Sequence, residues 1–162
     1  MKRCSLRASR LWLISGKGKI KSSDLVSDHL RISLDEFSNP FDADIDNDGN
    51  IYVTDDGMNR VQKFDSNGNY VSQFGTYGTG NGELAGPTGI KIKNNNIYIV
   101  DSGNGRVQKF DMSGNYVSQF GTPRGEDAGG NGKFYQPTFI DIDSQGNIYV
   151  ADSGDNLIQK FD

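Results

Sequence analysis

The tetrapeptide Gln-Lys-Phe-Asp occurs three times in this chain of 162 residues, at Gln62–Asp65, Gln108–Asp111 and Gln159–Asp162. A Val or Ile precedes every copy, and an Ile-Tyr-Val or Ile-Tyr-Ile segment and an Asp lie upstream of it. The residue numbers place the first two copies 46 residues apart and the last two 51 apart. Self-similarity at such a spacing indicates a repeat architecture, and it constrains the fold more than any single motif does.

Each copy has the pattern of a four-stranded antiparallel meander. Aligned on Pro40, Pro87 and Pro137, the copies share β-branched and aromatic segments, which favour strands, separated by Gly- and Asn-rich turns. Gly and Asn tolerate the positive φ that hairpin turns require. The expected strands are 41–46, 51–54, 61–64 and 70–74, then 88–93, 97–100, 107–110 and 116–120, then 138–143, 148–151 and 158–161.

A repeated meander of about 40–50 residues has the period of a β-propeller blade. Consecutive apolar residues such as Ile51, Tyr52 and Val53 indicate a strand that is buried on both faces, as it is between stacked blades. A β-sandwich fits less well, because sandwich strands seldom repeat as blocks, whereas residues 68–76 and 114–122 are identical. We predict an all-β fold, a partial β-propeller of about three four-stranded antiparallel blades near 37–75, 84–121 and 134–162, the last lacking its outer strand.

Several spaced motifs resemble the NHL repeat. They are Pro-x-Gly-Ile at Pro87–Ile90, Gly-Asn-Ile-Tyr-Val at Gly146–Val150, and Asp-Ser-Gly-Asn-x-Arg-Val-Gln-Lys-Phe at Asp101–Phe110. The resemblance covers about residues 34–162 and implies blades of a six-bladed propeller that serves mostly as a binding module. The third copy departs from it, since Leu157 stands where the earlier copies have Arg60 and Arg106.

Three blades make about half of a six-bladed ring. The chain is then a fragment of a longer propeller, or one of two half-rings that self-associate through exposed blade faces, or a partly ordered monomer. Residues 1–33 fit none of the repeats, and we expect a basic segment there that is flexible or has one short strand.

Charge is unevenly distributed along the chain. Residues 1–36 carry 8 basic and 4 acidic side chains, whereas residues 37–162 carry 9 basic and 17 acidic ones. The acidic repeats argue against binding to a nucleic-acid backbone. Cys4 is the sole cysteine, so an internal disulfide is excluded. Neither a membrane span nor a clear signal peptide is recognisable, and the compartment stays open.

An Asp opens the turn after the second strand of every copy, at Asp55, Asp101 and Asp152. These carboxylates could form a ring of acceptors on one rim, or each could accept N–H groups of its own Gly-containing turn. The Arg five residues later in two copies could pair with the Asp across that turn. The candidate binding residues are Asp55, Arg60, Tyr77, Asp101, Arg106, Arg124 and Asp152.

Asp44, Asp46 and Asp48, followed by Gly49, imitate a calcium-binding loop. The second copy has Lys91 and Lys93 at the first two positions, and lysine offers no ligand to a cation. A hairpin turn explains the pattern better, so we predict no cofactor and hold these three residues only as weak metal candidates.

Catalysis finds little support, because His29 is the sole histidine and lies outside the repeats. We expect a non-enzymatic binding or scaffold module that presents a loop rim, with segments 76–86 and 122–136, to a protein, peptide or saccharide. The alternatives are a fragment of a metal-dependent lyase or hydrolase propeller and an RNA-binding NHL module, which the acidic charge disfavours.

Overall fold

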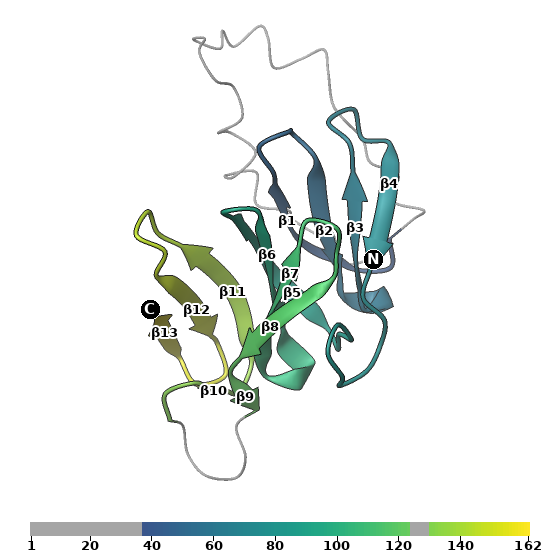
Figure 1. Ribbon diagram of the computed structural model, residues 1–162. Coiled ribbons are helices and arrows are strands. Elements are labelled where there is room, and N and C mark those ends of the chain that lie inside the picture. The colour runs from purple at the N-terminus through teal and green to yellow at the C-terminus, as the bar shows by residue number, and fades with distance from the viewer. Residues whose placement is uncertain (1–36, 124–129) are drawn as a thin grey trace, which may run out of the picture.

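The computed structural model describes residues 37–123 and 130–162, and it is built of three antiparallel sheets of four, four and three strands (Figure 1). The predicted segment 1–33 and the candidate Arg124 lie outside the described residues. Blade one consists of β1 (Pro40–Ile45), β2 (Ile51–Asp55), β3 (Arg60–Phe64) and β4 (Tyr70–Phe74). Blade two consists of β5 (Pro87–Lys93), β6 (Asn96–Asp101), β7 (Arg106–Asp111) and β8 (Tyr116–Phe120). Blade three consists of β11 (Pro137–Ile142), β12 (Ile148–Asp152) and β13 (Leu157–Phe161).

Each blade is a meander in which consecutive strands pair, so the predicted all-β partial propeller is confirmed. The first strands β1, β5 and β11 lie beside one another and form the inner edges of the blades. In the part of the chain that the structure describes, no helix is long and apolar enough to cross a membrane.

Four turns share the sequence Asp-x-x-Gly-Asn and the same hydrogen bonds. In the third blade, Asp143 Oδ1 accepts the N–H groups of Gln145 and Asn147, and its Oδ2 accepts the Asn147 amide at 2.7 Å. Gly146 has a φ of 96°, a conformation that costs an L-residue energy. The equivalent turns begin at Asp46, Asp65 and Asp111.

The opposite end of the blades carries the connections between blades, and we call it the interblade rim. It consists of the loop segments 75–86, 121–123 and 130–136 and the turns 56–59, 102–105 and 153–156. The turns include η4 (Asp56–Met58) and η5 (Ser102–Asn104). In the first loop Tyr77 bridges Leu84 in parallel, and in the second β9 (Thr122–Pro123) pairs in parallel with β10 (Lys133–Phe134). This rim faces the lower end of Figure 1.

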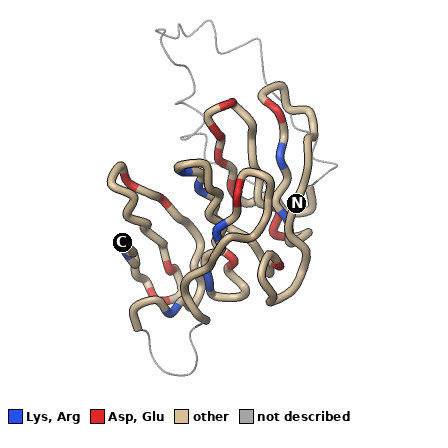
Figure 2. Tube along the Cα trace, viewed as in Figure 1, with Lys and Arg blue, Asp and Glu red and all other residues tan. Residues whose placement is uncertain are grey.

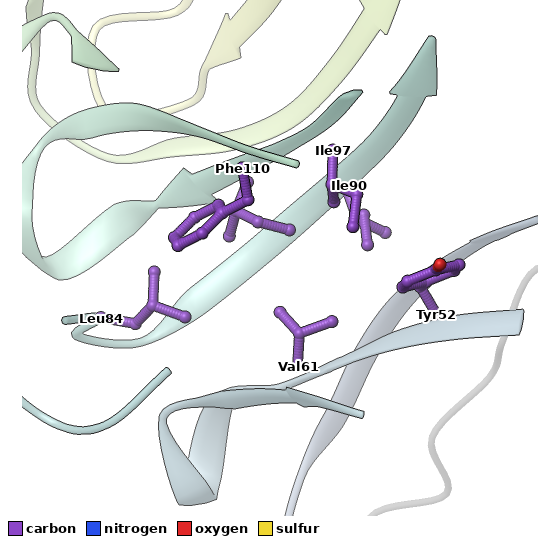
Figure 3. Packing of buried hydrophobic residues seen from close by; sticks show 7 residues of the cluster. Tyr52, Val61, Leu84, Ile90, Ile97 and Phe110 are labelled. Carbon is purple, nitrogen blue, oxygen red and sulfur yellow. The ribbon is translucent and has the colours of Figure 1, made fainter. Parts of the chain in front are cut away.

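The hydrophobic core lies between the blades. Figure 3 shows Tyr52 and Val61 of blade one facing Leu84, Ile90, Ile97 and Phe110 of blade two. A second cluster joins blades two and three, with Val107, Phe134 and Ile140 buried in it. Each fully buried side chain of this size contributes about 1.5–3 kcal/mol, so blade stacking is the main source of stability.

Aromatic contacts recur at the same place in both blade interfaces. The rings of Phe74 and Phe110 lie 4.9 Å apart between centroids, and those of Phe120 and Phe161 lie 4.7 Å apart. Leu84 and Phe134, at equivalent positions in the two loops, are both buried between blades.

Candidate functional site

The three repeated Asp residues are completely buried. Asp55, Asp101 and Asp152 have 0% of their surface exposed. Their carboxylates accept N–H groups from the loop that enters their own blade, such as that of Ala85 to Asp101 at 2.7 Å and that of Gln136 to Asp152 at 2.9 Å. Of the two alternatives, acceptance from the backbone N–H groups of the Asp's own turn does not describe these contacts, although the side-chain amide of Asn104, in the turn after Asp101, does donate to Asp101. The loop residues before the strand-opening Pro cannot find β-partners, so the carboxylate satisfies their buried N–H groups.

Arg106 extends this network to the next strand and to the loop. Its Nε donates to Asp101 Oδ2 at 2.7 Å, its Nη1 to Gln119 of β8 at 2.8 Å, and its Nη2 to the carbonyls of Gly80 and Glu83. The equivalent ion pair in blade one is longer, with Arg60 Nε 3.4 Å from Asp55 Oδ2. The Asp–Arg pair suggested by the five-residue spacing therefore exists in both blades.

The Gln of the repeated tetrapeptide completes the arrangement. Gln108 donates to the Glu83 carbonyl at 2.6 Å and to Asp101, while its side-chain oxygen accepts the Gly82 N–H. Gln159 makes the same contacts with the carbonyl of Lys133 and the N–H of Gly132. The repeated residues thus fasten each interblade loop to its own blade, and they present little surface to a ligand.

Exposed aromatic and sulfur-containing side chains occupy the interblade rim instead. Tyr77 is 77% exposed, and Tyr135 and Met58 are each 53% exposed. Tyr135 lies against Gly154, because a Cβ atom at Gly154 would come within 2.3 Å of the Tyr135 ring. The backbone N–H of Tyr135 donates to the Asp152 carboxylate. Tyr135 is therefore positioned both by its main chain and by the packing of its ring against Gly154.

The calcium-like residues are engaged in the turn and in the neighbouring blade. Asp46 accepts the N–H groups of Asp48 and Asn50 and the Asn50 amide. Burial would raise the pKa of Asp46, yet these hydrogen bonds outweigh it and lower the pKa. Asp44 accepts the Ile92 N–H of β5 at 2.8 Å. Within residues 37–123 and 130–162, no group of three or more His, Cys, Asp or Glu side chains is arranged to hold a metal ion.

A cluster of charges on the inner strands was not found from the sequence. Lys91 of β5 places its Nζ 3.7 Å from Asp44 of β1 and 3.2 Å from Asp141 of β11, so one lysine links three blades. All three residues are the fourth after a strand-opening proline, at Pro40, Pro87 and Pro137. Alignment of the repeats shows that the three charged residues occupy the same position. Their contact becomes evident only when the inner strands are seen to lie beside one another.

Comparison with known proteins identifies the fold and its family. Residues 44–124 match the model of a family described as a 6-bladed beta-propeller, and residues 134–161 match the NHL repeat. No curated protein matches the chain.

Several solved structures share the fold at low sequence identity. A streptogramin B lyase structure has a TM-score of 0.57 at 20% identity, covering 74% of this chain and 36% of that one. Virginiamycin B lyase from Staphylococcus aureus, with quinupristin, has a TM-score of 0.53 at 16% identity, covering 75% and 40%. An auxiliary nutrient binding protein from Bacteroides thetaiotaomicron has a TM-score of 0.58 at 12% identity, covering 73% and 36%.

The chain spans well under half the length of these three structures, which fits a fragment of a propeller. The predicted NHL-type architecture is confirmed by the family match and by the three stacked meanders. This protein therefore belongs to the 6-bladed beta-propeller family and carries an NHL repeat in its last described blade.

Proposed function

We propose that the protein is a non-enzymatic binding module whose interblade rim contacts a protein, peptide or saccharide partner. The observation that carries the proposal is the exposure of Tyr77 and Tyr135 on loops that are fastened to the blades. A Tyr ring supplies a large amphipathic contact area with little loss of conformational entropy on binding. Rings held by the backbone also lose less freedom when a partner arrives.

The state of the charged residues supports a binding role. Three acidic side chains of this rim, Asp55, Asp101 and Asp152, are buried under loop N–H groups. A general acid or base must reach the proton it transfers, and these carboxylates are covered. Among the described residues, basic and acidic positions are mixed along all three blades, as Figure 2 shows, and this mixture disfavours binding to a polyanion.

Two kinds of structural neighbour bear on the proposal. The auxiliary nutrient binding proteins have this fold and are named for binding. The streptogramin B and virginiamycin B lyases have the same fold and are named for catalysis. The alternative for this chain is a part of a metal-dependent lyase or hydrolase propeller. Titration calorimetry with Ca²⁺ and Zn²⁺ separates the two, because stoichiometric sub-millimolar metal binding would favour the alternative.

The proposal is tested on glycan and peptide arrays probed with the labelled protein and with a Tyr77→Ala/Tyr135→Ala variant. Tyr70→Ala is the matched control, because Tyr70 is 49% exposed but lies at the opposite end of blade one. Ligands retained by the protein and by the control, but lost by the double variant, are expected. Ligands retained equally by all three proteins would contradict the role of the rim.

A further inference from the structure

Asn-Gly dipeptides recur along this chain, and the structure places them in different surroundings. They are Asn67-Gly68, Asn81-Gly82, Asn104-Gly105 and Asn131-Gly132. An Asn followed by Gly is prone to spontaneous deamidation, because glycine has no side chain to hinder attack by its backbone nitrogen on the amide carbon of the asparagine. The attack requires that the glycine N–H is available and that the side-chain amide can turn toward it. Hydrogen bonds to either group therefore slow the reaction.

Asn104 is restrained by its side chain. Its Nδ2 donates to the carbonyl of Gly78 at 2.8 Å and to the two carboxylate oxygens of Asp101, at 2.9 and 3.1 Å. The N–H of Gly105 donates to the Ser102 carbonyl at 3.1 Å, and Gly105 is buried. Because Asp101 is completely buried, turning the Asn104 amide away would leave a buried acceptor short of a partner, and this cost suppresses the reaction.

In the interblade loops the glycine nitrogen is engaged instead. The Gly82 N–H donates to Gln108 Oε1 at 3.0 Å, and the Gly132 N–H donates to Gln159 Oε1 at 2.9 Å. Gln108 is 0% exposed and its side-chain amide nitrogen donates to the Glu83 carbonyl, which fixes the orientation of its oxygen. The glutamine of the repeated tetrapeptide therefore withholds the attacking nitrogen in these loops.

Asn67 has neither restraint. It lies at an exposed position in the turn between β3 and β4, at the end of blade one opposite the interblade rim (Figure 1), and its side-chain amide has no hydrogen bond to another described residue. Its backbone N–H donates to Asp65 Oδ1 at 2.9 Å, and the Gly68 N–H donates to the Asp65 carbonyl at the same distance. The bond to Gly68 lies in an exposed turn, where local opening costs less than in the core.

The exposure of Asn67 is a property of this kind of turn. The residue before the glycine is exposed in each Asp-x-x-Gly-Asn turn of the described residues. In the equivalent turn of blade two it is Ser113, and that turn packs against blade one, since a Cβ at Gly114 would come within 2.7 Å of the Phe74 ring. The position therefore stays exposed with a neighbouring blade in place.

We propose that Asn67 is a site of spontaneous deamidation in the folded protein, whereas the other three Asn-Gly pairs are protected by their contacts. The Gly68 nitrogen attacks Asn67 Cγ, so that a new N–Cγ bond forms and the Cγ–Nδ2 bond breaks. The proton of the Gly68 nitrogen leaves with the amide nitrogen as ammonia. Water then adds to one of the two carbonyl carbons of the cyclic imide and opens it to an aspartyl or an isoaspartyl residue, without an oxidant or another reactant.

The aspartyl product fits the turn. The first turn of blade one already has Asp48 before Gly49, and Asp46 there accepts the N–H groups of Asp48 and Asn50. An aspartate at position 67 therefore leaves the fold unchanged and adds one negative charge to the surface. The isoaspartyl product adds a methylene to the main chain and displaces the N–H groups that donate to Asp65, so it weakens the turn.

The test is incubation of the whole chain at neutral pH and physiological temperature, followed by peptide mapping with mass spectrometry. Each Asn-Gly pair is then measured in the same molecules. Deamidation at Asn67 is expected to be about tenfold or more faster than at Asn81 or Asn104, because one hydrogen bond to a buried or charged partner suffices for such a factor. In concentrated urea the rates should converge, because only the common dipeptide chemistry remains.

A transplanted pair tests whether the turn itself permits the reaction. Ser113→Asn places an Asn before Gly114 in the equivalent turn of blade two, at an exposed position that should tolerate the change. Its deamidation should proceed at about the rate of Asn67. Asn67→Ser, which copies blade two, is the control and should remove the fast-reacting site.

Gln108→Leu tests the protection of the interblade loop. It frees the Gly82 N–H and should raise the rate at Asn81, with Asn131 of the other loop as the slow reference. Circular dichroism verifies folding, and if this variant is unfolded the Ser113→Asn comparison decides. The proposal is overturned if Asn67 reacts no faster than the other pairs in the folded protein, or if the transplanted pair of blade two stays unmodified.

Discussion

Arg106 donates its Nε–H to a carboxylate oxygen of Asp101 across 2.7 Å, with both side chains buried between β6, β7 and the preceding loop. The same guanidinium reaches the fourth strand and two loop carbonyls, so one side chain joins three parts of blade two. The Arg106–Asp101 pair therefore stabilises the position of the interblade rim relative to blade two.

Arg106→Leu, which copies Leu157 of blade three, is expected to destabilise the protein by about 3–5 kcal/mol, because it leaves the Asp101 charge buried without its cation. The free energy of unfolding from urea titration measures the effect. Arg60→Leu is the matched control and should cost less, since its ion pair is longer, at 3.4 Å, and more exposed. Equal costs in the two blades would show that the tight pair has no special role.

Gly121→Ala is expected to be far more destabilising than Gly146→Ala. Both glycines have a positive φ, of 85° and 96°, so the backbone strain is shared. A Cβ at Gly121 would lie 2.3 Å from the Phe134 ring, whereas nothing lies within 4 Å of one at Gly146. The difference in unfolding free energy should be about 1–3 kcal/mol, the cost of overpacking the contact between blades. A difference near zero in thermal or urea unfolding would mean that Phe134 moves aside without cost.

The Asp-x-x-Gly-Asn turns make stability depend on acid pH. The Asn147 amide is the largest of the interactions that lower the pKa of Asp143 from 3.8 to about 2. A carboxyl whose folded pKa is depressed stabilises the fold above its unfolded pKa and loses that contribution as the pH falls through the folded value. Stability from this turn is therefore expected to decline between about pH 4 and pH 2.

Asn147→Ala should raise the pKa of Asp143 toward 3.8, as measured by carboxyl ¹³C chemical shifts during an NMR titration. Asn115→Ala provides the control, because it removes the hydrogen bond that most lowers the pKa of Asp111 and leaves Asp143 unchanged. An unchanged Asp143 titration in Asn147→Ala would show that the amide does not set this pKa.

The strands were predictable from the sequence because their signals are local. The predicted 70–74 and 116–120 coincide with β4 and β8, and the other predicted strands differ by one residue at one or both ends, whereas the short β9 and β10 were not predicted. Alternating β-branched and aromatic residues, with Gly and Asn at positive φ between them, suffice to define a hairpin.

The site was less predictable because its contacts join segments far apart in the sequence. Asp101 meets Ala85, which is 16 residues away, and Asp44 meets Ile92, which is 48 residues away in the next blade. An Asp beside a Gly-containing turn suggests a hydrogen bond within that turn. The loop before the strand-opening proline, however, has buried N–H groups without a strand partner, and these donate to the carboxylate instead. The exposure of Tyr77 likewise depends on how the loop lies over the blade.

Lys91→Ala is expected to destabilise the protein by about 0.5–1 kcal/mol, because its two partners on β1 and β11 are partly exposed and solvent weakens both pairs. The cost should shrink in about 1 M NaCl, where charges are screened within a few ångströms. Urea unfolding at low and high salt measures this. A salt-independent cost would point to packing of the lysine stem between the inner strands.

The central claim is that the interblade rim binds through its exposed aromatic residues while the buried Asp residues hold it together. The most direct measurement is titration calorimetry of the Tyr77→Ala/Tyr135→Ala variant with the tightest array ligand, alongside Tyr70→Ala. Aromatic contact residues often cost about 1–2 kcal/mol each when truncated, so at least tenfold weaker binding is expected with an unchanged midpoint of unfolding. Unchanged affinity in the double variant, or equal loss in Tyr70→Ala, would contradict the account.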